Sequence, residues 1–454
     1  MKHNIFIKAL LCASLIFSSH FSSLNSQVLS LDSCLALARR NNVDIRTSQI
    51  EIEKAREVKA QVYTKYFPQV QLSALGYYAA NPLLNFGIED VQSSDMREIL
   101  EALYESVAAA GSDIKKEVTM MKKGVSGSLV LAQPIYTGGR IATGNRLAEL
   151  GVEAAELQSE IQIRDIIENI ESSYYLIIAL QQKEATVSSA LALIDSLDRT
   201  VQSALANGLV TRSDALQIQL KRNEMLANQQ QLASGIRLSK RLLCCQIGID
   251  YSDALSFSDP SLVAPPPLSF SYSTVGDSLR PETRLLQLSV EAEELNRRMT
   301  LGEALPQLTL LGSAYYGNIM KTNPTGNAVA LLSLSVPLTS WWETSHKLRQ
   351  HDIRIAEARM KQEHLTHMMS LEEEKAYSDM IDSYMLLKSD SAALDVAQEN
   401  YRLANLNYKA GVAMISDVLQ AHTLLLQAQN AITDRRTTYI MARRRLLDLQ
   451  RSRN

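Results

Sequence analysis

The sequence predicts a mostly helical α+β protein that contains the same structural unit twice. Glycine and proline are sparse whereas Ala, Leu, Gln and Glu are abundant, and this composition favours long helices. Two short regions instead have apolar residues at every second position, as expected of strands with one apolar face. Three pairs of equivalent positions are each 203 residues apart: Pro134 and Pro337, Gly208 and Gly411, Asp214 and Asp417.

The first 26 residues are typical of a secretory signal peptide, because Lys2 and Lys8 precede an apolar run that ends near Phe17. The rest of the chain has no run of about 18 apolar residues, so we expect no transmembrane helix. The formal net charge of −3 at pH 7 argues against a nucleic-acid partner. We interpret Cys34, Cys244 and Cys245 as small buried side chains, and leave open a disulfide from Cys34 to either of the other two.

The first repeat covers 27–257. Apolar residues at helical spacing predict a helix over 30–66, which Pro68 ends. A strand hairpin follows at about 68–136. The loop between its strands, about 81–122, has no counterpart in the second repeat, and its spacing is partly helical.

A helical hairpin completes the first repeat at about 141–247. Its first arm lacks proline over about 66 residues, and at 1.5 Å per residue such a helix spans roughly 100 Å. Val187, Ile194 and Val201 recur every seven residues, which predicts a coiled-coil seam. Gly208 permits a left-handed helix end before the returning arm.

The second repeat covers 276–454 and has the same order of elements. A linker with three consecutive prolines, 258–275, precedes it. We predict its strand hairpin at about 306–338 and its helical hairpin at about 341–450, with Gly411 at the turn. Each chain therefore contributes four strands, which are too few to close a barrel; two chains give eight strands and three give twelve.

Aromatic residues lie at or near the ends of the predicted strands. Such residues gather at bilayer interfaces when strands cross a membrane, but ordinary cross-strand packing is an equal alternative. The set comprises Tyr77, Tyr78, Tyr136, Tyr315, Tyr316, Trp341 and Trp342.

The sequence contains few residue patterns that are typical of an enzyme active site or a metal site. His364 and His367 could share one helix face, but we interpret them as solvated. The charged runs 372–374 and 443–445 are interpreted in the same way. We find no nucleophile triad and no phosphate-binding loop, so we predict neither an enzyme nor a cofactor.

Several short strings, in this order and spacing, resemble the TolC family of outer-membrane efflux proteins over essentially the whole mature chain. The strings are Leu31–Ala38 with Asn41–Asn42, Tyr66–Val70, Gln133–Arg140, Leu279–Glu282 and Leu305–Leu308. The resemblance implies a homotrimer with a twelve-stranded barrel in the bacterial outer membrane, in contact with its lipid, and a coiled-coil barrel of helices extending into the periplasm. It further implies a passive exit duct for small molecules that works with a periplasmic adaptor and an inner-membrane transporter.

The resemblance also assigns roles to the two helical tips. The second tip would hold the periplasmic gate, at Tyr408, Asp417 and Gln420. Family members often have Arg where Ala413 stands and Asp where Gln420 stands, so here Asp417 alone would form an acidic ring that favours cations. An adaptor would dock on Gly208, Leu209, Thr211, Arg212 and Asp214, and on Gly411 of the second tip; an ordinary capped turn is the alternative for the first tip.

Three other functions are compared with this prediction. A protein-secretion duct would have the same helices and strands, so the sequence leaves it open. An envelope stalk or adhesin would have strands only near the C-terminus and no duplication, which does not match. A secreted enzyme lacks a catalytic constellation.

Overall fold

A computed structural model describes residues 28–81, 84–109, 117–120, 123–258, 265, 280–318 and 324–451. The predicted signal peptide, and the predicted linker apart from Ser258 and Pro265, lie outside these residues. The chain forms two compact units. The helical unit contains residues up to 54, 153–288 and from 360 onwards; the sheet unit contains 55–152 and 289–359.

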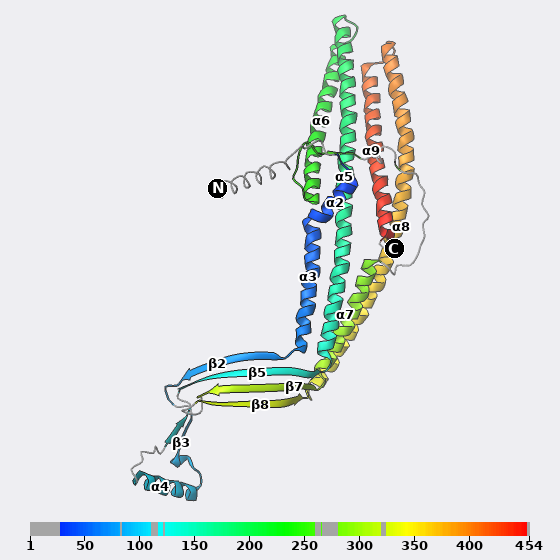
Figure 1. The fold of residues 1–454 in the computed structure, drawn as a ribbon. Coiled ribbons are helices and arrows are strands. Elements are labelled where there is room, and N and C mark those ends of the chain that lie inside the picture. Colours follow the sequence, from blue (N-terminus) through cyan, green and yellow to red (C-terminus); the bar gives the residue numbers. More distant parts are fainter. Residues whose placement is uncertain are drawn as a thin grey trace, which may run out of the picture. The chain divides into compact units, whose positions relative to one another are not determined.

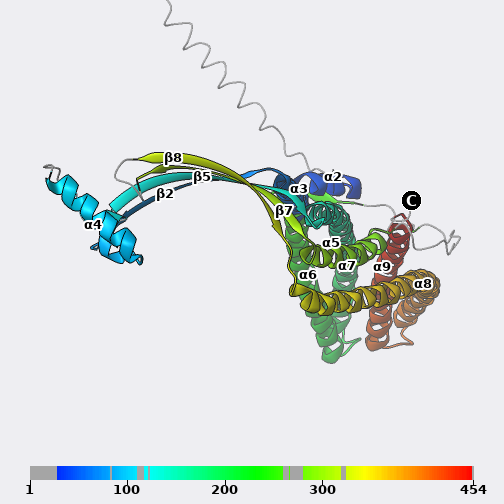
Figure 2. The same cartoon turned by 90° about the horizontal axis from the view of Figure 1, so that it is seen from below.

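The sheet unit is built around four antiparallel strands in the order β2-β5-β7-β8. Their bounds are Gln69–Tyr78 for β2, Lys123–Thr137 for β5, Gln307–Gly317 for β7 and Thr325–Ser335 for β8. The strands lie side by side and curve together (Figure 1, Figure 2). A bulge between Pro134 and Tyr136 shifts the register of β5 against β7, so proline falls where the ladder is already interrupted.

The inserted loop contains more structure than its sequence pattern indicates. α4 (Ser94–Ala109) is the predicted helical part. A short antiparallel pair, β3 (Leu84–Gly87) with β4 (Glu117–Met120), was not predicted. Four-residue strands are too short to show a clear period in sequence. Between β3 and α4, the 3₁₀ turn η2 (Ile88–Asp90) begins at Gly87, whose N–H donates to Asp90 Oδ2 at 2.7 Å.

The single helix predicted over 30–66 is wrong, because Asn42 divides it. The observed elements are α2 (Leu31–Asn41), α3 (Val43–Tyr63) and the 3₁₀ turn η1 (Thr64–Tyr66). Asn42 has extended backbone dihedrals, and its Oδ1 accepts the N–H of Ile45 at 3.0 Å, as a helix N-cap does. Its Nδ2 donates to the carbonyl of Gln246 at 2.7 Å, which ties this break to the end of the returning helix.

Five further helices make up most of the chain: α5 (Arg140–Ala206), α6 (Arg212–Ile247), α7 (Pro281–Glu303), α8 (Ser340–Lys409) and α9 (Ile415–Arg451). α5 with α6 and α8 with α9 are the two predicted helical hairpins. Both α5 and α8 contribute residues to each unit. None of the described helices combines the length and hydropathy that a membrane crossing requires.

One core of the helical unit surrounds a two-stranded parallel sheet, β1 (Val28–Leu29) with β6 (Ser256–Phe257). The hydroxyl of Tyr174 is buried there and donates to the carbonyls of Leu29 and Ser258 at 3.1 and 3.0 Å. Cys34 and Cys244 belong to this core, whereas Cys245 is exposed, and all three are free thiols. Burial, together with the nearby Cys244, raises the pKa of Cys34 to about 12, which keeps its thiol protonated.

Candidate functional site

One face of the four-stranded sheet is apolar along nearly its whole length. Directly paired residues share a face, so the register assigns each side chain. Leu72, Leu332 and Leu334 of this face are 77%, 64% and 65% exposed. Their neighbours do not cover them. Two polar residues share this face, Lys123 opposite Tyr78 and Gln133 opposite Leu310. The aliphatic residues of the apolar face are Val70, Leu72, Ala74, Val125, Leu129, Leu131, Leu308, Leu310, Ala314, Ala328, Ala330, Leu332 and Leu334.

The opposite face of the sheet carries hydroxyl and amide groups among smaller numbers of aliphatic side chains. The hydroxyls of Ser73 and Ser128 lie 3.0 Å apart across β2 and β5. We call this surface the hydroxyl face; its polar members are Gln69, Gln71, Ser73, Ser126, Ser128, Thr137, Gln307, Thr309, Ser313, Thr325, Asn327, Ser333 and Ser335. A sheet with one uncovered apolar face and one hydroxyl face is suited to separate lipid from water.

Both edges of this sheet are open within one chain. Among the described residues, β2 pairs only with β5, and β8 pairs only with β7. Each edge presents backbone N–H and C=O groups without ladder partners, and in lipid every such group costs several kcal/mol. The apolar face and the open edges together require further strands from other chains if the sheet lies in a membrane.

The aromatic residues predicted at strand ends lie at both ends of the sheet. Tyr77, Tyr78, Tyr315 and Tyr316 are at one end, and Tyr136, Trp341 and Trp342 are at the other. The ten residues of β2 span about 33 Å, comparable with a bilayer core. Consecutive strand residues point to opposite faces, so Tyr78, Tyr136 and Tyr316 share the apolar face whereas Tyr77 and Tyr315 lie on the hydroxyl face. The alternation of residues along each strand could have assigned these tyrosines to their two faces from the sequence alone.

The first helical tip is a tightly bonded turn. Gly208 has φ +74°, its N–H donates to Leu205 O at 3.0 Å, and the N–H of Leu209 donates to Ala204 O at 2.9 Å, which is a Schellman motif. Thr211 and Asp214 then form a reciprocal capping box at the start of α6.

The predicted docking residues Leu209, Thr211 and Arg212 are all exposed at the end of the first hairpin, and Leu209 is 77% exposed. The alternative of a capped turn describes the backbone correctly. A capped turn does not, however, account for the exposure of the apolar side chain of Leu209 and the basic side chain of Arg212.

The second tip repeats this turn with different side chains. Gly411 has φ +75°, and the N–H groups of Gly411 and Val412 donate to Tyr408 O and Asn407 O, both at 2.9 Å. Asp417 Oδ2 accepts the N–H of Met414 at 3.1 Å, so this predicted gate residue also caps α9. Val412 and Met414 are 78% and 73% exposed.

The structure separates the three predicted gate residues of the second tip. Asp417 and Gln420 are exposed, whereas Tyr408 is half-buried against the apolar residues beneath both tips. Burial raises the pKa of Tyr408, and the carboxylate of Asp214 in the first tip adds to that shift. Tyr408 therefore faces the other hairpin of its own chain.

A buried apolar cluster joins the two hairpins below their tips. Ile194 and Val201 of the predicted heptad seam are fully buried within it. We call it the tip cluster; it comprises Ala190, Ile194, Leu197, Val201, Ala215, Ile218, Met225, Ile415, Val418, Leu419 and Leu426.

His422 lies 3% exposed on α9, with its ring 5.6 Å from that of Tyr401 on α8. Its Nδ1 has no hydrogen-bond partner among the described residues. Burial, together with the ammonium group of Lys221 on α6, lowers the pKa of His422 to about 4.

We expect His422 to make the helical unit acid-sensitive. Its pKa is lower in the folded than in the unfolded chain, so the stability is fully present above about pH 6.5 and is lost as pH falls toward 4. The loss should approach about 3 kcal/mol per protomer. Urea unfolding at pH 7 and pH 4.5, followed by the helical circular dichroism signal, measures it. A His422→Phe variant should lose less stability between these two pH values than the parent; an equal loss in both would contradict the assignment.

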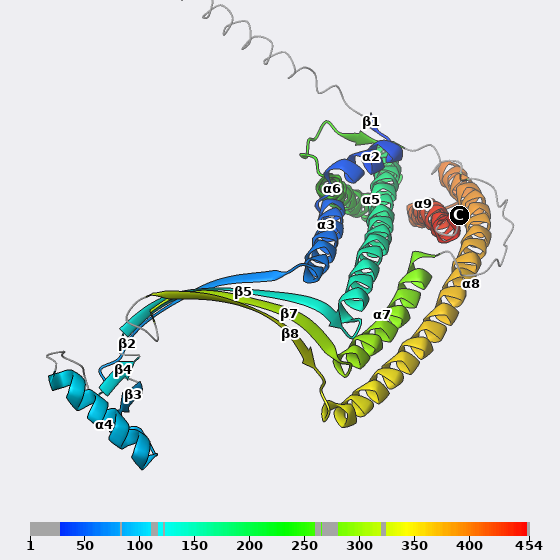
Figure 3. The same cartoon turned by 60° about the horizontal axis from the view of Figure 1, so that its bottom comes forward.

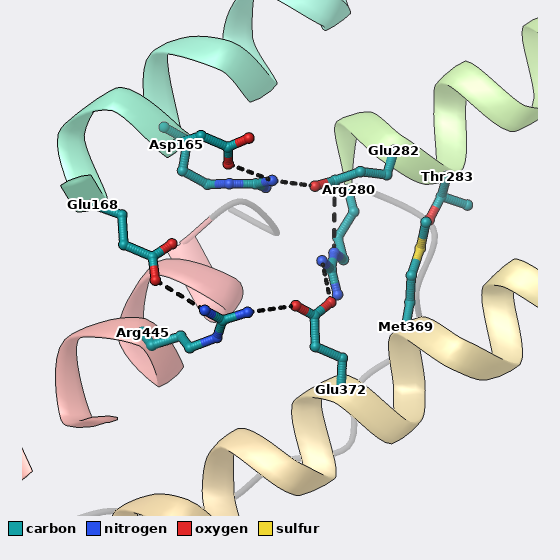
Figure 4. Close-up of polar contacts among 9 residues, drawn as sticks. Asp165, Glu168, Arg280, Glu282, Thr283, Met369, Glu372 and Arg445 are labelled. Atoms are coloured by element: carbon teal, nitrogen blue, oxygen red, sulfur yellow. Dashed lines mark hydrogen bonds and ion pairs between the residues drawn. The ribbon is translucent and has the colours of Figure 1, made fainter. Parts of the chain in front are cut away.

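An ionic network unites four helices in the helical unit (Figure 4). Arg280, which precedes α7 and is only 4% exposed, contacts Glu372 of α8 at 3.4 Å and Glu282 at 3.6 Å. Glu282 also pairs with Arg164 of α5. Arg445 of α9 contacts Glu372 at 3.1 Å and Glu168 of α5 at 2.9 Å.

The interpretation of 372–374 and 443–445 as solvated faces did not predict this network. Arg445 is exposed, in agreement with that interpretation, but it forms ion pairs to two other helices, and Glu372 and Arg444 are only partly exposed. Arg444 pairs with Glu171, which is 4% exposed. Burial would raise the pKa of Glu282, but hydrogen bonds from Arg164 and a backbone N–H, together with the charges of Arg164 and Arg280, outweigh burial and lower the pKa, so this carboxylate stays ionised. The signal that could have pointed here is Arg280 beside Pro281 at the start of the second repeat.

The predicted histidine pair remains a solvated feature. His364 and His367 are both exposed on α8. Among the described residues, no group of three His, Cys, Asp or Glu side chains is placed to hold a metal ion.

The sequence model of one protein family, described as outer membrane efflux protein, matches residues 279–449. The second repeat carries an outer membrane efflux protein domain. The matched region begins at Leu279, directly before Arg280, and contains β7, β8 and the second helical hairpin. The predicted resemblance is confirmed for this part of the chain. A search of curated proteins finds no match.

Solved structures share the fold of nearly the whole chain. The outer membrane protein VceC from Vibrio cholerae is 16% identical with a TM-score of 0.70, over 92% of this chain and 95% of its own. The MtrE outer membrane channel of Neisseria gonorrhoeae, in an open state, is 16% identical with a TM-score of 0.72, over 93% and 88%. The CmeC outer membrane channel of Campylobacter jejuni is 15% identical with a TM-score of 0.71, over 92% and 85%. The predicted fold class is thus confirmed, and the efflux domain agrees with the predicted function class and location.

Proposed function

We propose that the chain is one protomer of a trimeric exit duct in the outer membrane, which passively conducts small molecules from the periplasm to the outside. The observation that carries this proposal is the four-stranded sheet, with its uncovered apolar face, its hydroxyl face and its two open edges. Three chains supply twelve strands, which close a barrel with lipid outside and water inside.

The aromatic residues on the apolar face, Tyr78, Tyr136 and Tyr316, are proposed to lie at the two membrane interfaces. Trp342 is 78% exposed and suits the same role near the periplasmic end. Trp341 is anchored to the protein, since its Nε1 donates to Ala304 O at 3.0 Å. In this arrangement the helical hairpins extend into the periplasm, where an adaptor docks on the first tip and an inner-membrane transporter supplies energy. The efflux domain favours small-molecule cargo over the protein-secretion alternative.

Two adjacent leucines of β8 provide a direct test of the membrane orientation. Leu332 lies on the apolar face and is 64% exposed, whereas Leu331 lies on the hydroxyl face and is 56% exposed. Leu332→Arg should block assembly, because an arginine facing lipid near the midplane costs about 2–4 kcal/mol in each protomer. Leu331→Arg should be tolerated and should change ion selectivity.

Mass measurement in detergent and planar-bilayer conductance provide the readouts for the parent and both variants. The parent should have the mass of three chains and should conduct. A monomeric or dimeric parent, or equal effects of the two arginines, would contradict the proposed barrel.

Asp417 is proposed to form the acidic ring at the periplasmic end. Asp417→Asn should lower cation selectivity in planar bilayers, because three carboxylates leave the narrowest part of the pore. Since Asp417 also caps α9, the variant should lose some stability as well. Asp214→Asn removes the corresponding carboxylate from the first tip, so its thermal stability calibrates the loss of the cap. An unchanged cation selectivity in Asp417→Asn would contradict the proposed role of Asp417 in the gate.

A further inference from the structure

A groove lies where the sheet meets the helices of the sheet unit. It has a volume of about 610 Å³ and is bounded by α3, α5 and α7. Figure 3 shows the ends of these three helices next to the sheet. Its walls are largely apolar, with Val62 on α3, Ile141 and Leu147 on α5, and Met299 on α7. None of these four side chains is fully buried, so the walls are accessible from outside the protomer.

The groove opens on the hydroxyl face of the sheet. Gln69, Pro134 and Thr137 line it, and the register places all three on that face: Gln69 opposite Ala132, Pro134 opposite Thr309 and Thr137 opposite Gln307. In the proposed duct this is the water-filled side. A molecule moving along the lumen therefore meets an apolar recess at the junction between barrel and helices.

Two cations at the groove lack carboxylate partners among the described residues. Arg140 donates to neutral oxygens, the carbonyl of Thr137 at 3.4 Å and Gln307 Oε1 at 3.3 Å. Lys65 is exposed, and its ammonium group forms no ion pair within the part of the chain that the structure describes. Glu303 is the acidic residue of the lining, so two cations and one carboxylate line the groove. The groove thus combines apolar walls with excess positive charge.

Gly144 keeps the groove open between α3 and α5. A Cβ at this position would lie 3.9 Å from Val62 Cγ1, so alanine fits but a longer side chain extends into the groove. This position offers a way to fill the groove without changing its charge.

We propose that this groove binds anionic amphiphiles, molecules with a flat apolar body and one sulfonate or carboxylate group, as they pass through the duct. The apolar body lies against Val62, Ile141 and Met299, and the anion lies between Lys65 and Arg140. This inference rests on the proposed function and identifies one class of cargo for it.

Isothermal titration of the purified protein in nanodiscs of zwitterionic lipid with 2-naphthalenesulfonate tests the proposal. We expect one site per protomer. Lys65→Glu and Gly144→Met should each weaken binding about tenfold or more, the first by reversing a charge and the second by filling the groove. Lys54→Glu on α3, where Lys54 pairs with Glu51 in the helical unit, should bind like the parent. The cation 2-naphthylmethylammonium should bind at least about tenfold more weakly than the sulfonate.

Several results would overturn the proposal. They are the absence of sulfonate binding, equal binding of sulfonate and ammonium, and parent-like affinity in both Lys65→Glu and Gly144→Met. Helical circular dichroism of each variant shows whether it is folded, and Lys65→Glu, on an exposed side chain, serves if Gly144→Met does not fold. Titration does not depend on conduction, so failure to bind is distinguishable from failure to form a pore, which the conductance of the parent reports.

Discussion

Gly138→Ala is expected to destabilise the sheet unit by about 3–5 kcal/mol, the sum of backbone strain and a steric clash. Gly138 has φ +65°, and an added Cβ would lie 2.2 Å from the carbonyl oxygen of Gly302 and 2.9 Å from its carbonyl carbon. The contact joins the end of β5 in the first repeat to the end of α7 in the second. Backbone atoms of both repeats would have to separate to admit one methyl group.

Gly139→Ala is the matched control for this prediction. Gly139 has φ +76°, but nothing lies within 4 Å of an added Cβ. Its cost should be limited to the left-handed backbone, about 1–2 kcal/mol. The chain has two tryptophans, Trp341 and Trp342, and both are in the sheet unit, so tryptophan fluorescence during guanidinium unfolding reports on this unit alone. Equal midpoints for the two alanine variants would show that the approach to Gly302 is unimportant.

Arg280→Met is expected to destabilise the helical unit by about 3–5 kcal/mol, the usual cost of removing one partner from a buried ionic network. The variant would leave Glu372 with Arg445 alone and Glu282 with Arg164 alone. Glu282 and Glu372 would both lose the guanidinium group of Arg280, which contacts both of them. Methionine approximates the aliphatic part of arginine, so the loss is chiefly one of charge.

Arg359→Met provides a comparison at an exposed ion pair. Arg359 is 63% exposed at the side chain and contacts Glu294 at 2.8 Å. Solvent screens such a pair, and its loss should cost less than about 1 kcal/mol. Guanidinium unfolding followed by helical circular dichroism compares the two variants. A cost for Arg280→Met no larger than that for Arg359→Met would mean that the network is screened by water and holds nothing together.

The elements with strong local signals could be predicted from the sequence. The positions of β2, β7, α5 and α8 follow from a period of two or of about 3.6, and Gly208 and Gly411 from the need for positive φ after a long helix. Asn42 was missed because asparagine is tolerated within a helical pattern. Only its bond to Gln246, 204 residues away, shows why the helix divides there.

The candidate sites divide in the same way. The tips and strand-end aromatics were found because they lie at element boundaries, where unusual residues are conspicuous. The ionic network was not found, because its acids and bases come from α5, α8, α9 and the start of α7, each within an ordinary-looking charged run. No spacing along the chain relates Glu168 to Arg445, which are 277 residues apart.

By itself, the sequence determined the duplication, the alternation of strand and helix hairpins, and the excess of apolar residues on one side of each strand. These properties depend on interactions between residues near one another in the chain, which periodicity records. Only the tertiary structure decided that the two repeats meet at Gly138 and Gly302, that Arg280 is buried among carboxylates, and that a cationic groove lies beside the hydroxyl face. Those features depend on which distant segments pack together, and packing selects partners by shape and charge rather than by position in the sequence.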